Sequence, residues 1–333
     1  MSRLSRSKPR SGASAAKSNT ATATTGTDSP ARNDAGRPAA PYVGRFAPTP
    51  SGDLHLGSLY AAVASYLDAR AHGGRWLLRI EDLDRPREIA GSADGILHTL
   101  EQFGFEWDGA VTRQYDRAER YEEALGALHA QGRTFACCCS RAQLRAQFED
   151  ELRYPGTCRA RQIAPDTPAA IRVRVDAGYV LFTDRIQGTY RQDVADAVGD
   201  FILKRRDEIY AYVLAVTVDD AAQGVTHIVR GADLLDNTPR QIYLQRLLGL
   251  PEPSYAHVPV LTEAGGGKLA KSRRSVRLTA DSPLPQLCAV FSLLGLAPPP
   301  SLASAAISAA WRWAIGQWDL NKVPKRLDLP VND

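Results

Sequence analysis

The chain has 333 residues, 44% of them hydrophobic, which is enough for about two globular domains, and its five cysteines are too few for a disulfide-stapled scaffold. No apolar run approaches the roughly 18 to 20 residues of a membrane span, and the N-terminus lacks the apolar core of a secretory signal. The net charge of +4 comes from the first 40 residues, which hold seven Lys or Arg against two Asp, so it does not indicate that the remainder binds nucleic acid.

Residues 1–40 are rich in Ser, Ala, Thr, Gly, Pro and Arg and offer almost nothing to bury, which predicts a disordered basic tail. An Arg- and Ser-rich start that is poor in acidic residues also fits an organelle transit peptide. We favour the tail. Four of the cysteines crowd into residues 137–158, which is typical of a metal site in a reducing compartment. We therefore expect a soluble, cytoplasmic protein that does not contact membranes.

The pattern changes at Tyr42. Residues 42–47 predict a short strand, and the prolines and glycine of residues 48–52 predict a rigid turn. Residues 57–72 have apolar side chains at helical spacing and end at a Gly-Gly pair, and residues 76–80 predict a second strand. Strand, helix and strand in this order predict an α/β fold with a Rossmann-like, doubly wound parallel sheet.

The middle of the chain departs from this alternation. Helices are predicted over 92–104 and 116–131, after which come the cysteines, several prolines and strand-like stretches at 170–174 and 179–183. We interpret residues 130–194 as an insertion into the α/β domain.

The alternation returns after the insertion. Apolar stretches at 201–203, 210–216 and 226–229, with a helix over 237–248, predict the second half of the same sheet. The remaining residues predict helices around 283–296 and 301–318. The predicted organisation is a Rossmann-like domain of residues 41–129 and 195–280, an insertion of residues 130–194 and a C-terminal helical segment of residues 281–333.

Two short motifs indicate nucleotide chemistry. The tetrapeptide His55–Ser58 opens the first predicted helix, where free backbone N–H groups and the helix dipole attract phosphate, and Gly57 allows a nucleotide to approach closely. The second motif is Lys268–Ser272, which follows three glycines and is by itself also typical of a solvated basic loop. A P-loop is excluded, because the Gly-Lys pair is followed by Leu269.

In this order, the two motifs resemble the signatures of class I aminoacyl-tRNA synthetases. The blocks Arg45–Gly57 and Ile80–Arg85 resemble the glutamate-specific branch of that family. The resemblance implies that glutamate and ATP, the latter with Mg²⁺, are substrates. The chemistry of glutamate agrees, since its carboxylates call for Arg and its ammonium for an acidic side chain. In the second motif Ala270 replaces a usual serine, but Lys271 remains.

The resemblance also implies roles for individual residues. His55 and Lys271 would be catalytic, and ATP would contact His55, Gly57, Ser58, Lys268 and Lys271. Glutamate would contact Arg45, Phe46, Ala47, Pro48, Thr49, Glu81, Tyr212 and Arg230. Taken singly, Glu81 also fits a surface carboxylate paired with a nearby Arg, Arg230 a strand-end ion pair, and Tyr212 a core aromatic.

Cys137, Cys139 and Cys158 form a candidate zinc site. From the residues alone the fourth ligand stays open between Tyr154, Cys138, a histidine and water. The arrangement of three cysteines and a tyrosine resembles that of the glutamyl-Q tRNA(Asp) synthetases, which implies one Zn²⁺ held by Cys137, Cys139, Tyr154 and Cys158. A closed set of four protein ligands implies a structural role.

The end of the chain supports the same branch. Residues 272–333 are too few for the large helical anticodon-binding region that follows this loop in full glutamyl-tRNA synthetases. The glutamyl-Q branch attaches glutamate to the queuosine base in the anticodon of tRNA(Asp) and leaves the 3′ end uncharged. Residues 204–206 are a candidate contact for the anticodon loop, or equally a salt-paired strand end. The alternatives are a glutamyl-tRNA synthetase charging tRNA(Glu), and a non-catalytic RNA-binding paralogue.

Overall fold

The computed structural model describes residues 41–140, 142–144, 153–164, 166–263, 278 and 282–331. The predicted basic tail and the Lys-rich loop with Lys268, Ala270 and Lys271 lie outside the described residues.

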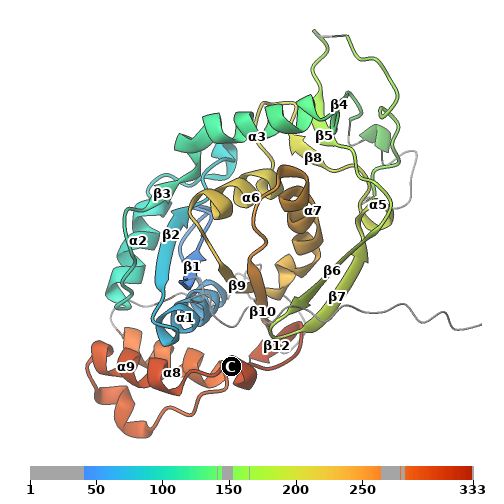
Figure 1. The fold of residues 1–333 in the computed structure, drawn as a ribbon. Coiled ribbons are helices and arrows are strands. Elements are labelled where there is room, and N and C mark those ends of the chain that lie inside the picture. Colours follow the sequence, from blue (N-terminus) through green and yellow to red (C-terminus); the bar gives the residue numbers. More distant parts are fainter. Residues whose placement is uncertain are drawn as a thin grey trace, which may run out of the picture. The chain divides into compact units, whose positions relative to one another are not determined.

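A parallel sheet forms the middle of the α/β region (Figure 1). Its strands are β1 Val43–Phe46, β2 Arg75–Ile80, β3 Thr112–Arg113, β9 His227–Gly231 and β10 Ser254–Val258. β1 pairs with β2, β2 with β3, and β9 with β10, all in parallel. The backbone N–H of Thr226 donates to the carbonyl of Val43 at 2.9 Å, which places β9 beside β1. The order β3-β2-β1-β9-β10 confirms the predicted doubly wound sheet, in which the first two strands in sequence lie near the middle.

Helices cover both faces of this sheet. Their bounds are α1 Leu56–Ala71, α2 Ser92–Gln102, α3 Ala118–Ala130, α6 Tyr212–Ala222 and α7 Thr238–Leu248, with 3₁₀ turns η1 Arg85–Arg87, η2 Gln114–Arg117 and η3 Ala232–Asn237. Alternate side chains of β2 enter different cores: Trp76, Leu78 and Ile80 pack with α1, whereas Leu77 packs with α3, α6 and α7. Arg79 shares the face of Leu77, so its charge is buried against α6.

The stretch 210–216 was predicted to add a strand, and this was wrong, because Tyr212 begins α6. Every residue from Val213 to Asp220 is buried. A helix that is buried all round shows no amphipathic period, so a short apolar run of it cannot be distinguished from a strand by pattern.

The strands of residues 134–193 pair antiparallel, and they include the predicted strand-like stretches at 170–174 and 179–183. β4 Thr134–Cys137 pairs with β5 Ala170–Val173, and β6 Tyr179–Asp184 forms a hairpin with β7 Gly188–Asp193, followed by the one-turn helix α5 Val194–Ala197. β8 Ile202–Lys204 was predicted to belong to the parallel sheet but pairs antiparallel with β5. A three-residue strand carries no pattern that shows which partner it takes.

The C-terminal segment is mostly helical, as predicted, with α8 Pro283–Leu293, η5 Pro300–Ser304, α9 Ile307–Gln317 and η6 Leu320–Lys322. An unpredicted strand, β12 Asp328–Val331, pairs in parallel with β11 Val260–Glu263. The indole of Trp311 in α9 packs against Phe105 and donates to the carbonyl of Phe103 at 2.9 Å, so α9 is anchored at the end of α2. Among the helices that the structure describes, none combines the length and apolarity of a membrane span.

Candidate functional site

A cavity of about 1090 Å³ lies at the carboxyl ends of β1, β2, β9 and β10. This is the edge of a doubly wound sheet where ligands bind. The predicted contacts that lie on its wall are Arg45, Phe46, Ala47, Pro48, Thr49, His55, Gly57, Ser58, Glu81, Tyr212 and Arg230. The fold therefore brings together residues that are up to 185 positions apart in sequence, and it leaves out only the two lysines that it does not describe.

The N-terminus of α1 forms one wall. His55 is its N-cap, and the backbone N–H of Ser58 donates to Nδ1 of His55 at 3.1 Å. Burial lowers the pKa of His55 although the charge of Asp233 opposes the shift, so the ring is neutral at pH 7 and carries its proton on Nε2. A Cβ on Gly57 would lie 3.1 Å from this ring, which is tighter than an ordinary contact, so the absence of a side chain at Gly57 leaves room for the ring of His55.

Arg45 and Arg79 project from neighbouring strands toward α6. Asp220 accepts from Nε of Arg45 at 3.1 Å and from Nη1 of Arg79 at 2.8 Å. The adjacent Asp219 accepts from Gln114 at 2.8 Å. Burial opposes the ionisation of Asp220, but the two arginines outweigh it and lower the pKa of that carboxyl. Sequence reasoning missed both aspartates, and an acidic pair within an apolar run was the signal that could have indicated them.

Glu81 follows β2 and is buried. Its Oε1 has no hydrogen-bond partner within the described residues, and the nearest cation, Nη2 of Arg79, lies 3.6 Å away. Burial outweighs the attraction of Arg79 and Arg45 and raises the pKa of Glu81 to about 7. Glu81 is not at the surface, although it does lie beside Arg79 as that alternative expected, and a buried acceptor without a hydrogen-bond donor suits an ammonium ligand.

Arg230 lies in β9 and lines the cavity. Its Nε donates to Nε2 of His257 at 3.0 Å, and its Nη2 donates to Thr238 at 2.8 Å and to Gln241 at 2.9 Å. Nη1 is buried and has no partner within the described part of the chain. The alternative of a strand-end ion pair is wrong, since these partners are neutral, and the free donor suits a carboxylate or another anion.

Tyr212 is the first residue of α6 and is half-buried on the cavity wall. Burial, and then the charge of Glu81, raise the pKa of its hydroxyl, which therefore stays protonated and can donate. The interpretation as a core aromatic does not hold, because the side chain reaches the cavity.

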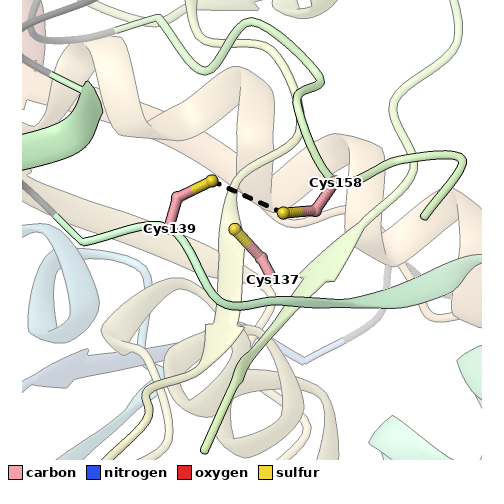
Figure 2. Close-up of side chains that lie close together, drawn as sticks. All are labelled: Cys137, Cys139 and Cys158. Atoms are coloured by element: carbon pink, nitrogen blue, oxygen red, sulfur yellow. Dashed lines mark hydrogen bonds between the residues drawn. The ribbon is translucent and has the colours of Figure 1, made fainter. Parts of the chain in front are cut away.

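The sulfur atoms of Cys137, Cys139 and Cys158 lie within 4.8 Å of one another, and the three side chains point toward a common centre (Figure 2). Cys139 and Cys158 have a Sγ–Sγ distance of 3.4 Å. The hydroxyl of Tyr154 lies 3.4 Å from Sγ of Cys137 and accepts from the backbone N–H of Cys158 at 2.8 Å. Cys138 is not part of this group. Thiolates bind Zn²⁺ at about 2.3 Å, so sulfurs at this spacing can hold one ion.

The three cations of residues 204–206 each have a partner within the protein. Lys204 pairs with Glu208 at 2.8 Å, and Arg205 pairs with Asp84 at 3.1 Å at the cavity wall. Arg206 donates to the carbonyl of Cys138 at 2.6 Å, which ties it to the cysteine group. The interpretation as a salt-paired strand end accounts for the first two cations.

The sheet, the cavity at its carboxyl edge and the helix N-terminus with His55 define the catalytic domain of a class I tRNA synthetase. The family described as tRNA synthetases class I (E and Q), catalytic domain, matches residues 42–282, and the chain belongs to this family. This confirms the resemblance seen in the sequence.

The chain is similar to curated proteins named glutamyl-Q tRNA(Asp) synthetase. It is 54% identical to that of Pseudomonas fluorescens over 87% of this chain and 96% of the relative, and 54% identical to that of Pseudomonas aeruginosa over 87% and 97%. A crystal structure of the glutamate-tRNA synthetase of Elizabethkingia anophelis matches with a TM-score of 0.73 and 24% identity, over 88% of this chain and 68% of that one. The structural likeness shows the fold alone.

Proposed function

We propose that the protein is a glutamyl-Q tRNA(Asp) synthetase, which activates glutamate with ATP and transfers it to the queuosine base in the anticodon of tRNA(Asp) without charging the 3′ end. The observation that carries this function is the 54% identity that extends over 96% of a relative of that name. The cavity supports it, because its unpaired buried groups complement an amino acid.

In the proposed glutamate site, the ammonium contacts Glu81, whose free oxygen lacks a donor. One carboxylate contacts the free Nη1 of Arg230. Arg45 supplies the second positive charge, and Asp220 holds its guanidinium at 3.1 Å. Tyr212 donates a hydrogen bond, and the backbone of Phe46, Ala47, Pro48 and Thr49 lines the wall. Cationic groups on two walls select a dicarboxylate over an apolar amino acid.

In the proposed activation step, the α-carboxylate attacks the α-phosphorus of ATP, the bond to pyrophosphate breaks, and glutamyl-adenylate forms. The N-terminus of α1, with His55, Gly57 and Ser58, binds the nucleotide. Lys268 and Lys271, supplied by the loop outside the described residues, neutralise the phosphate charge. Mg²⁺ enters with ATP and shares that task. A queuosine hydroxyl then attacks the acyl carbon, and AMP leaves with the bond to its phosphate oxygen broken.

We also propose that one structural Zn²⁺ is held by Cys137, Cys139, Tyr154 and Cys158. The fit rests on the common centre of the three sulfurs and on the hydroxyl 3.4 Å from Cys137. Free thiols in this number suit a reducing compartment, so we place the protein in the cytoplasm. The domain organisation of residues 41–129 and 195–280, 130–194 and 281–333 is proposed as predicted.

The function is tested by transferring labelled glutamate, with ATP, onto tRNA(Asp) with and without queuosine, each lacking the 3′-terminal adenosine. We expect label only on the tRNA that carries queuosine. Intact tRNA(Glu) serves as the comparison. Label on tRNA(Glu) instead would identify a glutamyl-tRNA synthetase, and no adenylate with any tRNA would identify a non-catalytic paralogue.

A further inference from the structure

A chain of buried hydrogen bonds lies behind the cavity wall at Arg230. Nε of Arg230 donates to Nε2 of His257 at 3.0 Å, and Nδ1 of His257 lies 2.6 Å from Oδ2 of Asp184. His257 and Asp184 are 0% and 2% exposed, and neither lines the cavity. His257 belongs to β10, whereas Asp184 ends β6 in the predicted insertion. The predicted insertion thus supplies a buried carboxylate that lies behind the cavity wall and reaches Arg230 through His257.

The partners of Asp184 determine where the imidazole proton lies. Oδ1 of Asp184 accepts from the backbone N–H groups of Ile186 at 3.0 Å, Gln187 at 2.8 Å and His257 at 3.2 Å. Burial opposes its ionisation, but the hydrogen bonds from His257 and the backbone outweigh burial and lower the pKa of Asp184. Burial also lowers the pKa of His257 to about 4, so its ring is neutral. A neutral ring beside this ionised carboxylate carries its proton on Nδ1 and presents a lone pair on Nε2.

That lone pair faces Arg230, which is otherwise held by Thr238 and Gln241 through Nη2. Since Nε and Nη2 are engaged behind the wall, Nη1 is left as the donor available to a ligand. We propose that Asp184 and His257 are positioning residues, which fix Arg230 so that its Nη1 receives a carboxylate of the amino-acid substrate. This inference rests on the proposed function for the identity of that substrate.

Asp184→Asn tests the inference with little change in shape. The amide oxygen can still accept from the backbone N–H groups, while the NH₂ group faces Nδ1 of His257. The imidazole proton then moves to Nε2, where it opposes the N–H of Arg230. In glutamate-dependent exchange of pyrophosphate into ATP, we expect KM for glutamate to rise about 10- to 100-fold, with KM for ATP within about twofold of wild type.

Two substitutions of His257 form a matched pair. His257→Gln places an amide oxygen near the position of Nε2 and keeps an acceptor for Arg230, whereas His257→Asn keeps a donor for Asp184 but has no atom that reaches Arg230. We expect KM for glutamate to stay closer to wild type in His257→Gln than in His257→Asn. Equal increases in KM for glutamate and ATP, or a lower melting temperature with an unchanged KM for glutamate, would overturn the inference.

A second readout needs no activity. In the ¹⁵N-histidine-labelled full chain, the His257 signal is identified by its loss in His257→Asn. We expect the Nδ1-protonated form in wild type and the Nε2-protonated form in Asp184→Asn. The Nε2 form in wild type would overturn the inference whatever the substrate is. A wild-type protein that forms no glutamyl-adenylate would instead count against the proposed function.

Discussion

At the scale of single residues, the charged groups of the cavity differ in whether they have partners. Arg45 and Asp220 satisfy each other, while Oε1 of Glu81 and Nη1 of Arg230 have no hydrogen-bond partner within the described residues. A buried polar group without a hydrogen bond costs about 1 to 3 kcal/mol. The ligand-free fold therefore retains two destabilised groups of opposite charge at one site, and a ligand with an ammonium and a carboxylate would satisfy both.

Glu81→Gln removes the charge of one of these groups and keeps its shape. We expect KM for glutamate to rise about 10- to 100-fold, because a buried charge-assisted hydrogen bond to an ammonium contributes about 1.5 to 3 kcal/mol. Pyrophosphate exchange at varied glutamate concentration measures this. Asp94→Asn, a change of the same chemistry on an exposed part of α2, is the control and should leave KM unchanged. An equal effect of both changes would exclude Glu81 as the ammonium contact.

The raised pKa of Glu81, about 7, predicts a pH dependence of binding. The carboxyl is protonated in the free protein below that pH, and only the ionised form attracts an ammonium. The dissociation constant for glutamate should therefore fall as pH rises from 6 to 8. The stability of the free protein changes with pH in the opposite direction. Burial disfavours the ionised carboxyl, so the contribution of Glu81 to the free energy of unfolding is lost as pH rises through about 7. Calorimetric titration across this range checks the first effect, and a flat profile in wild type would contradict it.

At the scale of elements, the N-terminus of α1 combines a side-chain cap with the proposed phosphate site. His55 both caps the helix and lines the cavity, and its position depends on Gly57, two residues later, where a Cβ would lie 3.1 Å from the ring. Helix α6 also positions two groups: Tyr212 lines the cavity, and Asp220, two turns later, accepts a hydrogen bond from Arg45. Short elements thus position several groups of the site at once.

Gly57→Ala tests the role of the α1 N-terminus. The added methyl would lie 3.1 Å from the ring of His55 and should displace it from the N–H of Ser58. We expect KM for ATP to rise about tenfold or more, with KM for glutamate unchanged, since a misplaced phosphate contact costs at least about 1.4 kcal/mol. Gly126→Ala in α3 is the matched control, because nothing lies within 4 Å of its added Cβ. It should be neutral or slightly stabilising.

The group of Cys137, Cys139 and Cys158 could hold a metal ion, and the proposed zinc site can be tested there. Cys158→Ser, or removal of the ion by a chelator, should lower the free energy of unfolding by about 2 kcal/mol or more, because metal binding contributes directly to folding. Metal analysis and thermal unfolding measure this. Cys138→Ser alters a neighbouring thiol outside the group and should retain the metal. Loss of metal in both variants would show that Cys138 is also a ligand.

At the scale of the whole described chain, distant segments meet at the buried carboxylate of Asp68 in α1. It accepts hydrogen bonds from Tyr42 before β1, from Arg185 after β6 at 2.6 Å and from Trp318 after α9 at 3.1 Å. Segments next to the sheet, the β6–β7 hairpin and the C-terminal helices are joined there. Arg185 directly follows Asp184, so this junction also fixes the strand end that reaches His257.

Asp68→Asn should lower the free energy of unfolding by about 2 to 4 kcal/mol, because Arg185 loses its charged partner in a largely buried setting. Trp318→Phe removes a single donor and should cost about 1 kcal/mol. Urea unfolding followed by circular dichroism measures both. If Asp68→Asn proves no more destabilising than Trp318→Phe, the ion pair does not join the segments.

The sequence predicted the features that depend on neighbouring residues and missed those that depend on distant ones. The strands 42–47 and 76–80, the helix 57–72 and the three cysteines were predictable, because alternation, helical spacing and metal-ligand spacing are local. α6 was mistaken for a strand since it is buried all round, and β8 and β12 could not be placed because short strands do not encode their partners. The resemblance of Arg45–Gly57 and Ile80–Arg85 to the family indicated cavity residues that no local pattern predicts.

By itself, the sequence determined the α/β class and the family, and through the family blocks it indicated some of the residues that line the cavity, since these depend on residue types and their order. Only the tertiary structure decided which charges have partners. Asp220 lies 175 positions from Arg45, and Asp184 lies 73 positions from His257. Whether a buried polar atom has a hydrogen-bond partner depends on what packs against it in space, and within the described residues Glu81 and Arg230 each keep one atom without such a partner.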